Sequence, residues 1–348
     1  MSKKNILFLI LSSALGLVLI FLWLHFIPFA EIGGYFRNLS VLPVLLASIS
    51  YLAAYFVRSF RWNLLLSQQQ KLPIRDTWLY AMGGNLINYL IPIRAGELIK
   101  AWFIKRNHGL GIAESLPSIF IDKTFDTLGI LAVIILIPFL TIRLSVGLIG
   151  LLVVLALVFS LSLIILLMAA RHKDKVSNML IRGFAWLPGS LKPRVRDLLQ
   201  RFVNSLNILE HHPAKLVAGI ILTALGIALD GFYFYMLFVA FKVPFSFTMA
   251  LFGYTLINLS YALPHPPAQL GSNEWLMIII FALGFGLTKS SASAIMAFAH
   301  VLTACLMGVI GAIAISISGF EVIRMIYKGD RFDGKPDRPD SESETSNL

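Results

Sequence analysis

The stretch Gly83–Lys100, GGNLINYLIPIRAGELIK, interrupts a sequence that is otherwise rich in apolar residues. It combines glycine and asparagine with Pro92 and a run of alternating charges. The bilayer core cannot hydrogen-bond free backbone groups, so a broken helix at membrane depth persists only where it is buried in protein or lines a wet cavity. We therefore expect the chain to be organised around this stretch, and the stretch to contribute to a functional site.

A second stretch, Gly253–Glu274 (GYTLINLSYALPHPPAQLGSNE), repeats the order glycine, Leu-Ile-Asn, apolar run, proline, glycine and glutamate. In each copy the asparagine lies five residues after the glycine, as Gly83 with Asn88 and Gly253 with Asn258. Interrupted hydrophobic segments at matching places in two halves point to the binding site of a transporter. The sequence thus predicts a repeat with a site between its copies.

The composition indicates a polytopic membrane protein. Of the residues, 57% are hydrophobic and 14% are charged, whereas about a quarter are charged in average soluble domains. The formal charge is +11, but the basic residues stand in short loops beside apolar runs, which favours cytoplasmic anchoring at anionic lipid over nucleic-acid binding. The single cysteine excludes an intramolecular disulfide.

About six apolar runs have the length of a membrane span. The first could be a signal peptide, but it exceeds the usual apolar core of such a peptide, so we interpret it as a retained span. The runs are Ile6–Ile27, Val41–Leu66, Leu116–Leu140, Val146–Ala170, Lys215–Phe241 and Ala292–Ser318.

The two broken segments are predicted to be re-entrant hairpins, at about residues 78–100 and 247–287. Cations before and after the first place its entry on the cytoplasmic side, and an odd number of intervening spans inverts the second. We expect the hairpins to meet near the bilayer midplane. The predicted fold is therefore an all-α polytopic membrane protein with an inverted repeat.

The rest of the chain fits one domain. Residues 1–328 form the transmembrane part, with a basic cytoplasmic loop at 171–213, and the polar residues 329–348 form a disordered cytoplasmic tail. Both termini are expected in the cytoplasm, and the protein in the inner or plasma membrane.

Ionisable residues inside a membrane are a functional hypothesis by default. Glu97 and Lys100 share a helix face just after Pro92, with Arg94 at the helix start. One interpretation is an interfacial salt bridge; the other is a phosphate-binding mouth gated by the carboxylate. Arg58 and Arg61, at the inner end of a span, are expected to face the cytoplasmic head groups.

Three aspartates leave similar alternatives open. Asp122 and Asp126 are spaced to share a face, where they either pair with arginines or act directly, for example by holding Mg²⁺. Asp230 lies deep in its span between Gly226 and Gly231, and we favour a role as a cavity partner over a structural hydrogen bond.

The broken segments contribute further polar candidates. Asn88 and Asn258 can satisfy freed backbone groups and also donate to a head group. Glu274 is favourable near a helix start, so capping alone could explain it. His265 and His300 are predicted to be hydrogen-bonded structural residues rather than proton relays.

The same residues carry a resemblance to a known family. The chain resembles the flippase-like transmembrane domain of lysylphosphatidylglycerol synthase from about Ile6 to Ile326. The matching residues are Arg58, Arg61, Trp62, Gly84, Asn88, Pro92, Arg94, Gly96, Glu97, Lys100, Asp126 and Glu274. The chain departs from the family at His265-Pro266-Pro267 and at Asp122-Lys123, and no aminoacyl-transfer domain is expected after the short tail.

The resemblance implies movement of an amphiphilic lipid between leaflets, and the hairpins favour the same function. The expected ligand is an anionic phospholipid or a polyprenyl-phosphate-linked lipid, with no metal or cofactor. The alternatives are a membrane glycosyl- or acyl-transferase subunit and a scaffold of lipid synthesis. No GxSxG, HExxH or P-loop motif indicates an enzyme. A second copy of the chain or a lipid-synthesis enzyme are the candidate protein partners.

Overall fold

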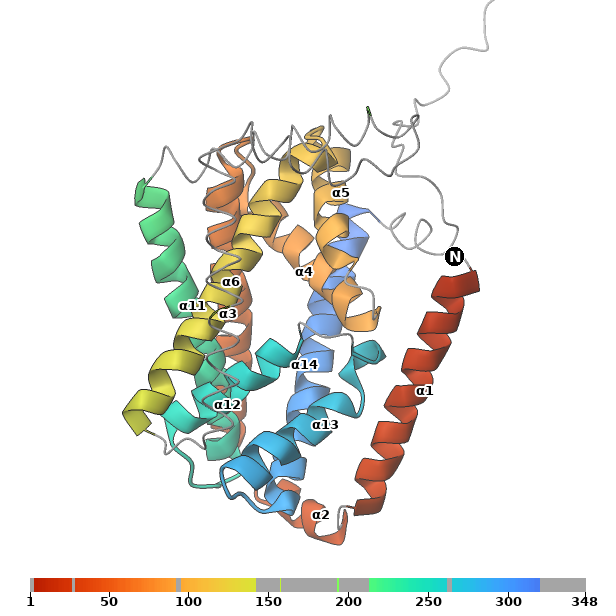
Figure 1. Cartoon of the computed structure of the whole chain (residues 1–348), viewed down its shortest axis with the longest axis vertical. Coiled ribbons are helices and arrows are strands. Elements are labelled where there is room, and N and C mark those ends of the chain that lie inside the picture. The colour runs from red at the N-terminus through yellow and green to blue at the C-terminus, as the bar shows by residue number, and fades with distance from the viewer. Residues whose placement is uncertain are drawn as a thin grey trace, which may run out of the picture.

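The computed structural model describes residues 3–26, 29–91, 95–141, 213–261 and 265–319, besides two single residues, Leu157 and Pro193. Every element in these ranges is helical (Figure 1). The predicted span Val146–Ala170, Arg94, nearly all of the basic loop 171–213 and the tail 329–348 lie outside the described residues.

The first helices agree with the expected spans and add one element. Helix α1 covers Lys3–Phe26 and α3 covers Val41–Leu66, the latter with the predicted bounds. Between them, the short helix α2 (Phe29–Arg37) was not predicted. Its Phe36 packs edge-on against Phe241, with ring centroids 5.5 Å apart, so α2 closes the end of the bundle.

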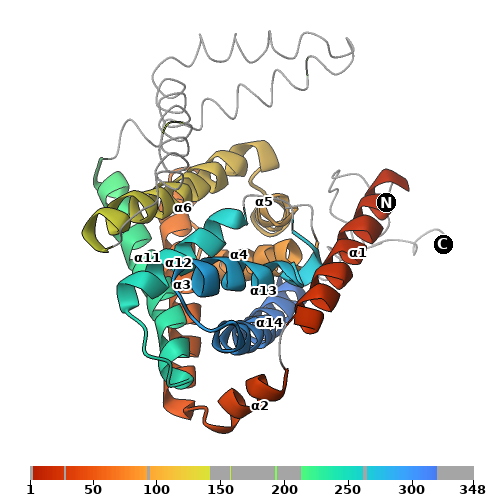
Figure 2. The ribbon, with the colours of Figure 1, turned by 60° about the horizontal axis from the view of Figure 1, so that its bottom comes forward.

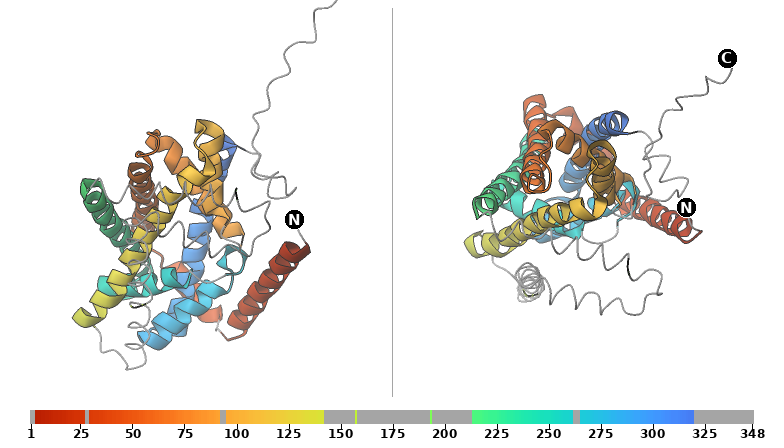
Figure 3. Two further views of the ribbon diagram at one scale, coloured as in Figure 1. Left: turned by 45° about the horizontal axis from the view of Figure 1, so that its top comes forward. Right: turned by 90° about the horizontal axis from the view of Figure 1, so that it is seen from above.

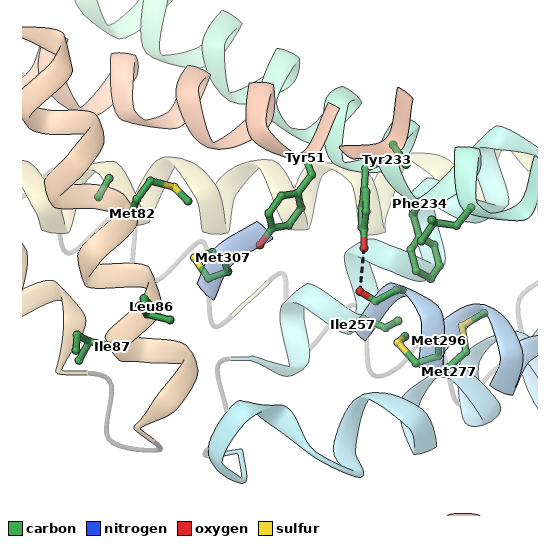
Figure 4. Close-up of a cluster of buried hydrophobic side chains, with 14 of the residues drawn as sticks. Tyr51, Met82, Leu86, Ile87, Tyr233, Phe234, Ile257, Met277, Met296 and Met307 are labelled. Atoms are coloured by element: carbon green, nitrogen blue, oxygen red, sulfur yellow. Dashed lines mark hydrogen bonds between the residues drawn. The ribbon is translucent and has the colours of Figure 1, made fainter. Parts of the chain in front are cut away.

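Helices α3 and α11 (Pro213–Ala240) pack closely against each other along one side of the bundle (Figure 2). Small buried residues on α3, Ala47 and Ala54 at 0% exposure, let the two backbones approach. The hydroxyl of Ser50 donates to the Leu229 carbonyl at 2.7 Å across this interface. In Figure 4, Tyr51 and Tyr233 extend from the pair toward α14.

The first broken segment is the helix pair α4 (Ile74–Leu90) and α5 (Gly96–His108). The pair is held at very close range, because an added Cβ on Gly96 would collide with the Gly84 carbonyl oxygen. Helix α5 ends at Gly109, whose φ of 76° suits glycine at a helix end. Helix α6 (Ile112–Thr141) follows and contains the predicted run Leu116–Leu140.

The second broken segment has more pieces. Helix α12 (Phe247–Ser260) precedes a 3₁₀ turn (Pro267–Gln269), α13 (Ser272–Met277) and a π-helix (Ile278–Gly284). Helix α14 (Lys289–Ser318) then runs through the bundle. Figure 1 shows α4 and α5 in the upper half of the molecule and α12 and α13 in the lower half.

The helix neighbours are arranged in matching pairs. Helix α4 packs on α3 and α14, while α12 packs on α11 and α6. Helix α1 lies at the edge of the bundle beside α13 (Figure 2) and projects from it when seen from above (Figure 3). Its Leu19 carbonyl accepts a hydrogen bond from the Trp275 indole at 3.0 Å, so α1 is attached to the second broken segment.

The outer surface is apolar, as a lipid-facing surface must be. Among the described helices, three are long and apolar enough to cross a membrane: Val41–Leu66, Ala214–Ala240 and Lys289–Ser318. Shorter apolar helices are Ile10–Phe26, Phe247–Ser260 and Ser272–Gly284. Large apolar side chains such as Leu17 and Phe21, both 68% exposed, cover these helices. The architecture is therefore that of an all-helical membrane protein.

Candidate functional site

A cavity of about 350 Å³ lies where the two broken segments face the helix pair α3 and α11. It receives side chains from α3, α4, α5, α6, α11, α12, α13 and α14. Most of the predicted site residues line it, namely Arg58, Asn88, Glu97, Lys100, Asp122, Asp126, Asp230 and Asn258. The fold thus brings together residues that the sequence placed in separate segments.

Arg61 lies behind the cavity wall and joins α3 to α6. Its guanidinium is fully buried and donates to Asp122 Oδ1 and to Asp126 Oδ1, both at 2.7 Å. A third bond, also 2.7 Å long, reaches the hydroxyl of Thr223. The prediction that Arg61 faces the head groups is wrong, because the two aspartates draw it into the protein interior.

Arg58 lies one turn earlier on α3 and borders the cavity. It makes a two-pronged pair with Asp230, with Nη1 at 3.2 Å from Oδ1 and Nη2 in contact with Oδ2. Its Nε is 3.4 Å from Asp126. Asp230 therefore lines the cavity and also forms an ion pair with Arg58. The two alternatives for this residue, a cavity partner and a structural hydrogen bond, both apply.

Glu97 stands between two lysines at the mouth of the first segment. Its carboxylate is 3.1 Å from Lys100 Nζ and 3.4 Å from Lys123 Nζ. Lys100 is nearly buried, with its ammonium 5.9 Å from the centre of the Trp62 ring. Within the described residues, each cation that lines the cavity thus faces a carboxylate.

Asn88 holds the break between α4 and α5. Its side-chain oxygen accepts from the Gly96 N–H at 2.7 Å, and its amide nitrogen donates to Glu97 at 3.2 Å. The amide thereby satisfies a backbone group that the broken helix leaves free. This confirms the expected backbone role of Asn88. The matching Asn258 lines the cavity from α12.

Glu274 pairs with a histidine of α14. Its Oε1 is 2.6 Å from His300 Nδ1, while His300 Nε2 is 2.7 Å from the Ala268 carbonyl. His300 lines the cavity, and Glu274 is buried behind it. His265 bonds to Ser260 and Ser272 at 2.8 and 3.1 Å. Both histidines are thus hydrogen-bonded, as the sequence led us to expect.

Sequence reasoning missed two groups of cavity residues. Lys123 was noted only as a departure from a family pattern, although its position between two aspartates of α6 was a usable signal. Phenols also surround the cavity, three from apolar runs and three from the broken stretches: Tyr51, Tyr55, Tyr233, Tyr89, Tyr254 and Tyr261. Tyrosine combines an apolar ring with a hydrogen-bonding end, so its recurrence inside spans could have revealed a polar interior.

Apolar helices around a polar, charged cavity define an integral membrane protein. The chain belongs to the family of the lysylphosphatidylglycerol synthase transmembrane region, which matches residues 9–311. Two similar proteins are both named UPF0104 membrane protein and come from Methanothermobacter thermautotrophicus. One is 23% identical over 80% of this chain and 84% of its own length, the other 22% over 84% and 90%. No solved structure matches the chain.

Proposed function

We propose that this protein moves an anionic amphiphilic lipid between the two leaflets of the inner or plasma membrane. The supporting observation is the cavity itself, in which charged side chains from helices far apart in sequence meet inside an apolar bundle. Charges in such a place are costly unless they serve a polar ligand or an ion path. The lipid is a phospholipid or a polyprenyl-phosphate-linked lipid.

The broken segments are proposed to be oppositely oriented hairpins of an inverted repeat. Their internal packing supports this, because Gly83 of α4 faces the ring of Phe103 in α5, and Gly253 of α12 faces the ring of Phe281. The neighbours of the two segments also correspond: α4 packs on α14, and α12 packs on α6. A two-fold relation between the halves requires such a correspondence. A site between such repeats is the arrangement of many transporters.

The first segment provides the anion site in this proposal. Lys100 and Lys123 both face Glu97, so a phosphate entering between them would take over the contacts of the carboxylate. Asn85 and Asn88 line the same part of the cavity and can donate to head-group oxygens. Arg94, which the sequence places between the break and Glu97, adds a further cation.

A transferase centred on Asp122 and Asp126 has less support. Arg61 engages both carboxylates at 2.7 Å, and Asp126 also faces Arg58. Carboxylates neutralised by arginine are poor ligands for Mg²⁺, because the cation would have to displace the guanidinium. The pairing thus favours a structural role for these two residues over phosphoryl or glycosyl transfer.

The test is translocation in liposomes of defined composition that contain the purified protein. Fluorescent phosphatidylglycerol should reach the inner leaflet faster than in protein-free vesicles, and Arg94→Ala should reduce the rate at least about tenfold, as expected for loss of a charge-assisted contact. Arg75→Ala, an exposed arginine at the far end of α4, is the matched control. Equal rates with and without protein would refute the proposal.

A further inference from the structure

The pair of Glu274 and His300 is arranged in a way that ordinary structural histidines are not. Both side chains are nearly buried, at 4% and 9% exposure. One ring nitrogen of His300 lies 2.6 Å from a carboxylate oxygen, and the other lies 2.7 Å from the Ala268 carbonyl oxygen. Each side of the ring thus meets an oxygen that ordinarily only accepts hydrogen bonds.

This geometry fixes the number of protons on the pair. A neutral imidazole has one N–H, so it can donate to only one of the two oxygens. Both short contacts are satisfied when the pair carries one more proton than a neutral histidine with an ionised glutamate. The proton then sits either on the ring or on the carboxyl group, and the pair as a whole is uncharged.

His265, in the same broken segment, provides the contrast. Its Nε2 meets the Ser260 carbonyl, but its Nδ1 meets the hydroxyl of Ser272. A hydroxyl can either donate or accept. A neutral His265 ring satisfies both contacts when the Ser272 hydroxyl donates to Nδ1 and not to the Gln269 carbonyl, which lies 2.9 Å from the same hydroxyl.

The proton on the pair stabilises the turn at residues 267–271, whose backbone is strained. Ala268 and Gln269 have φ values of 54° and 59°, and Gly271 has φ of 78°. Non-glycine residues keep such conformations only where their surroundings hold them. The bond from His300 to the Ala268 carbonyl is one of these restraints. When the pair loses its proton, one N–H remains on the ring, and the ionised carboxylate is the stronger acceptor for it, so the bond to the carbonyl is the one that is lost. Gln269 also lines the cavity, so the turn connects the pair to the proposed lipid path.

Among the residues that the structure describes, the other titratable groups around the pair are phenols and the thiol of Cys305 on α14. Tyr89 of α4 has its ring centroid 6.4 Å from that of His300, and Tyr233 of α11 is bonded to Thr303 on α14 at 3.0 Å. Tyr261, at the end of α12, faces the same cavity. The groups that helix α1 presents to this region are uncharged: the Leu19 carbonyl accepts a hydrogen bond from the Trp275 indole, and the Trp23 indole donates one to the Ser293 hydroxyl. Phenols are uncharged at neutral pH, so they leave the additional proton to the pair.

We propose that Glu274 and His300 form a proton-binding site whose occupancy holds the turn at residues 267–271, and that lipid movement is coupled to this proton. The first clause stands on the geometry alone, and the second rests on the proposed function. For a lipid with one negative charge, movement together with one proton carries no net charge. A proton gradient, and not the membrane potential, would then drive accumulation.

The coupling is tested with the full-length protein in liposomes that enclose a pH-sensitive dye, using fluorescent phosphatidylglycerol as the probe. The membrane potential is held at zero with valinomycin and equal potassium. Coupling of one proton to one lipid predicts up to about tenfold accumulation in one leaflet for each unit of pH difference. Lipid movement should also shift the dye signal, at a ratio of about one proton per lipid.

Two variants sharpen this test. Glu274→Gln should abolish the response to the gradient while translocation without a gradient continues, and Arg75→Ala, a change at an exposed position far from the turn, should respond as the unchanged protein does. Translocation that is the same with and without a gradient would overturn the coupling and leave the proposed function intact. An absence of translocation under every gradient would overturn the proposed function and the coupling together.

The proton site itself is tested without transport. Spectra of ¹⁵N-histidine-labelled protein in the same lipid, assigned with His300→Gln, should show His300 as an imidazolium or as a ring accepting from a protonated carboxyl group. Raising the pH should change this signal together with amide signals of residues 267–271. A neutral His300 ring beside an ionised carboxylate, or a turn that does not respond when the pair loses its proton, would overturn the site.

Discussion

The two broken segments share an order of residues but are closed by different chemistry. The first closes by direct backbone approach of Gly84 and Gly96 and by the amide of Asn88. The second closes through the side chains of His265 and His300, around a turn with positive φ. The comparison teaches that a shared pattern predicts the location of a break but not what holds it. Close packing favours a rigid first segment, and hydrogen bonds that depend on a proton favour a movable second one.

The largest effect is expected where the ion pairs between α3 and α6 are removed, because α3 packs on α4 and α6 packs on α12. Arg61→Ala would leave Asp122 and Asp126 buried without their shared cation, at a cost of about 3–5 kcal/mol in the free energy of unfolding. Thermal unfolding in detergent and the yield of monodisperse protein measure this loss. Arg75→Ala should change stability by less than about 0.5 kcal/mol. Similar yields and melting temperatures for both variants would show that Arg61 does not support the fold.

Adding one methyl group to each segment compares their rigidity directly. In Gly96→Ala the new Cβ meets backbone, which cannot move alone, so a loss at or above the usual 1–3 kcal/mol or so for overpacking is expected. In Gly253→Ala the Cβ meets the Phe281 ring, which can shift, so the loss should be smaller.

Gly308→Ala is the control for the two methyl additions. This glycine lies inside helix α14 with open space around a new Cβ, so the change should stabilise the protein by about 0.5–1 kcal/mol. The melting temperatures of the three variants should rank their stabilities, with Gly96→Ala lowest and Gly308→Ala highest. A Gly253→Ala protein less stable than Gly96→Ala would reverse the proposed difference in rigidity.

Substitution of the two matching asparagines, Asn88 and Asn258, distinguishes a side chain that supports the break from one that contacts the ligand. Asn88→Ala leaves the Gly96 N–H without its 2.7 Å acceptor and should cost about 1–3 kcal/mol. Asn258→Ala should change stability less, because its side chain makes no hydrogen bond to another described residue, and it should still slow lipid translocation, because Asn258 lines the cavity as Asn88 does. Parallel measurements of melting temperature and transport rate test the difference. Equal destabilisation by both changes would mean that the two breaks are held alike.

The smallest effect on stability is expected for Lys123→Ala. The side chain is 43% exposed and lies 3.4 Å from Glu97 and 3.9 Å from Asp126. Exposed ion pairs contribute about 0–1 kcal/mol, so the melting temperature should change little. Transport of phosphatidylglycerol should nevertheless fall, whereas a zwitterionic lipid of the same chain length should be affected less. A large loss of stability would assign Lys123 to the structural support of the first segment instead.

The sequence by itself determined most of the described long helices and the position of both breaks, but not helix α2 or the 3₁₀ and π pieces of the second segment. The predicted run Val41–Leu66 matches α3 at both ends, and the glycine, asparagine and proline pattern located both interruptions. These features depend on local forces, because a helix satisfies its own backbone hydrogen bonds and a long apolar run excludes water. The prediction that Asn88 supports a broken helix succeeded for the same reason, since its partner Gly96 is only eight positions away.

Only the tertiary structure decided which polar and charged groups meet. Arg58 and Asp230 are 172 positions apart, and Trp23 and Ser293 are 270 apart. Their contacts depend on how each helix is rotated about its axis and on which helices are neighbours, and neither is encoded in a local run of residues. Arg61 therefore turned inward to its aspartates although its position at the end of a span predicted the head groups. The pairing of His300 with both Glu274 and Ala268 likewise arises from the packing of α14 against a distant turn.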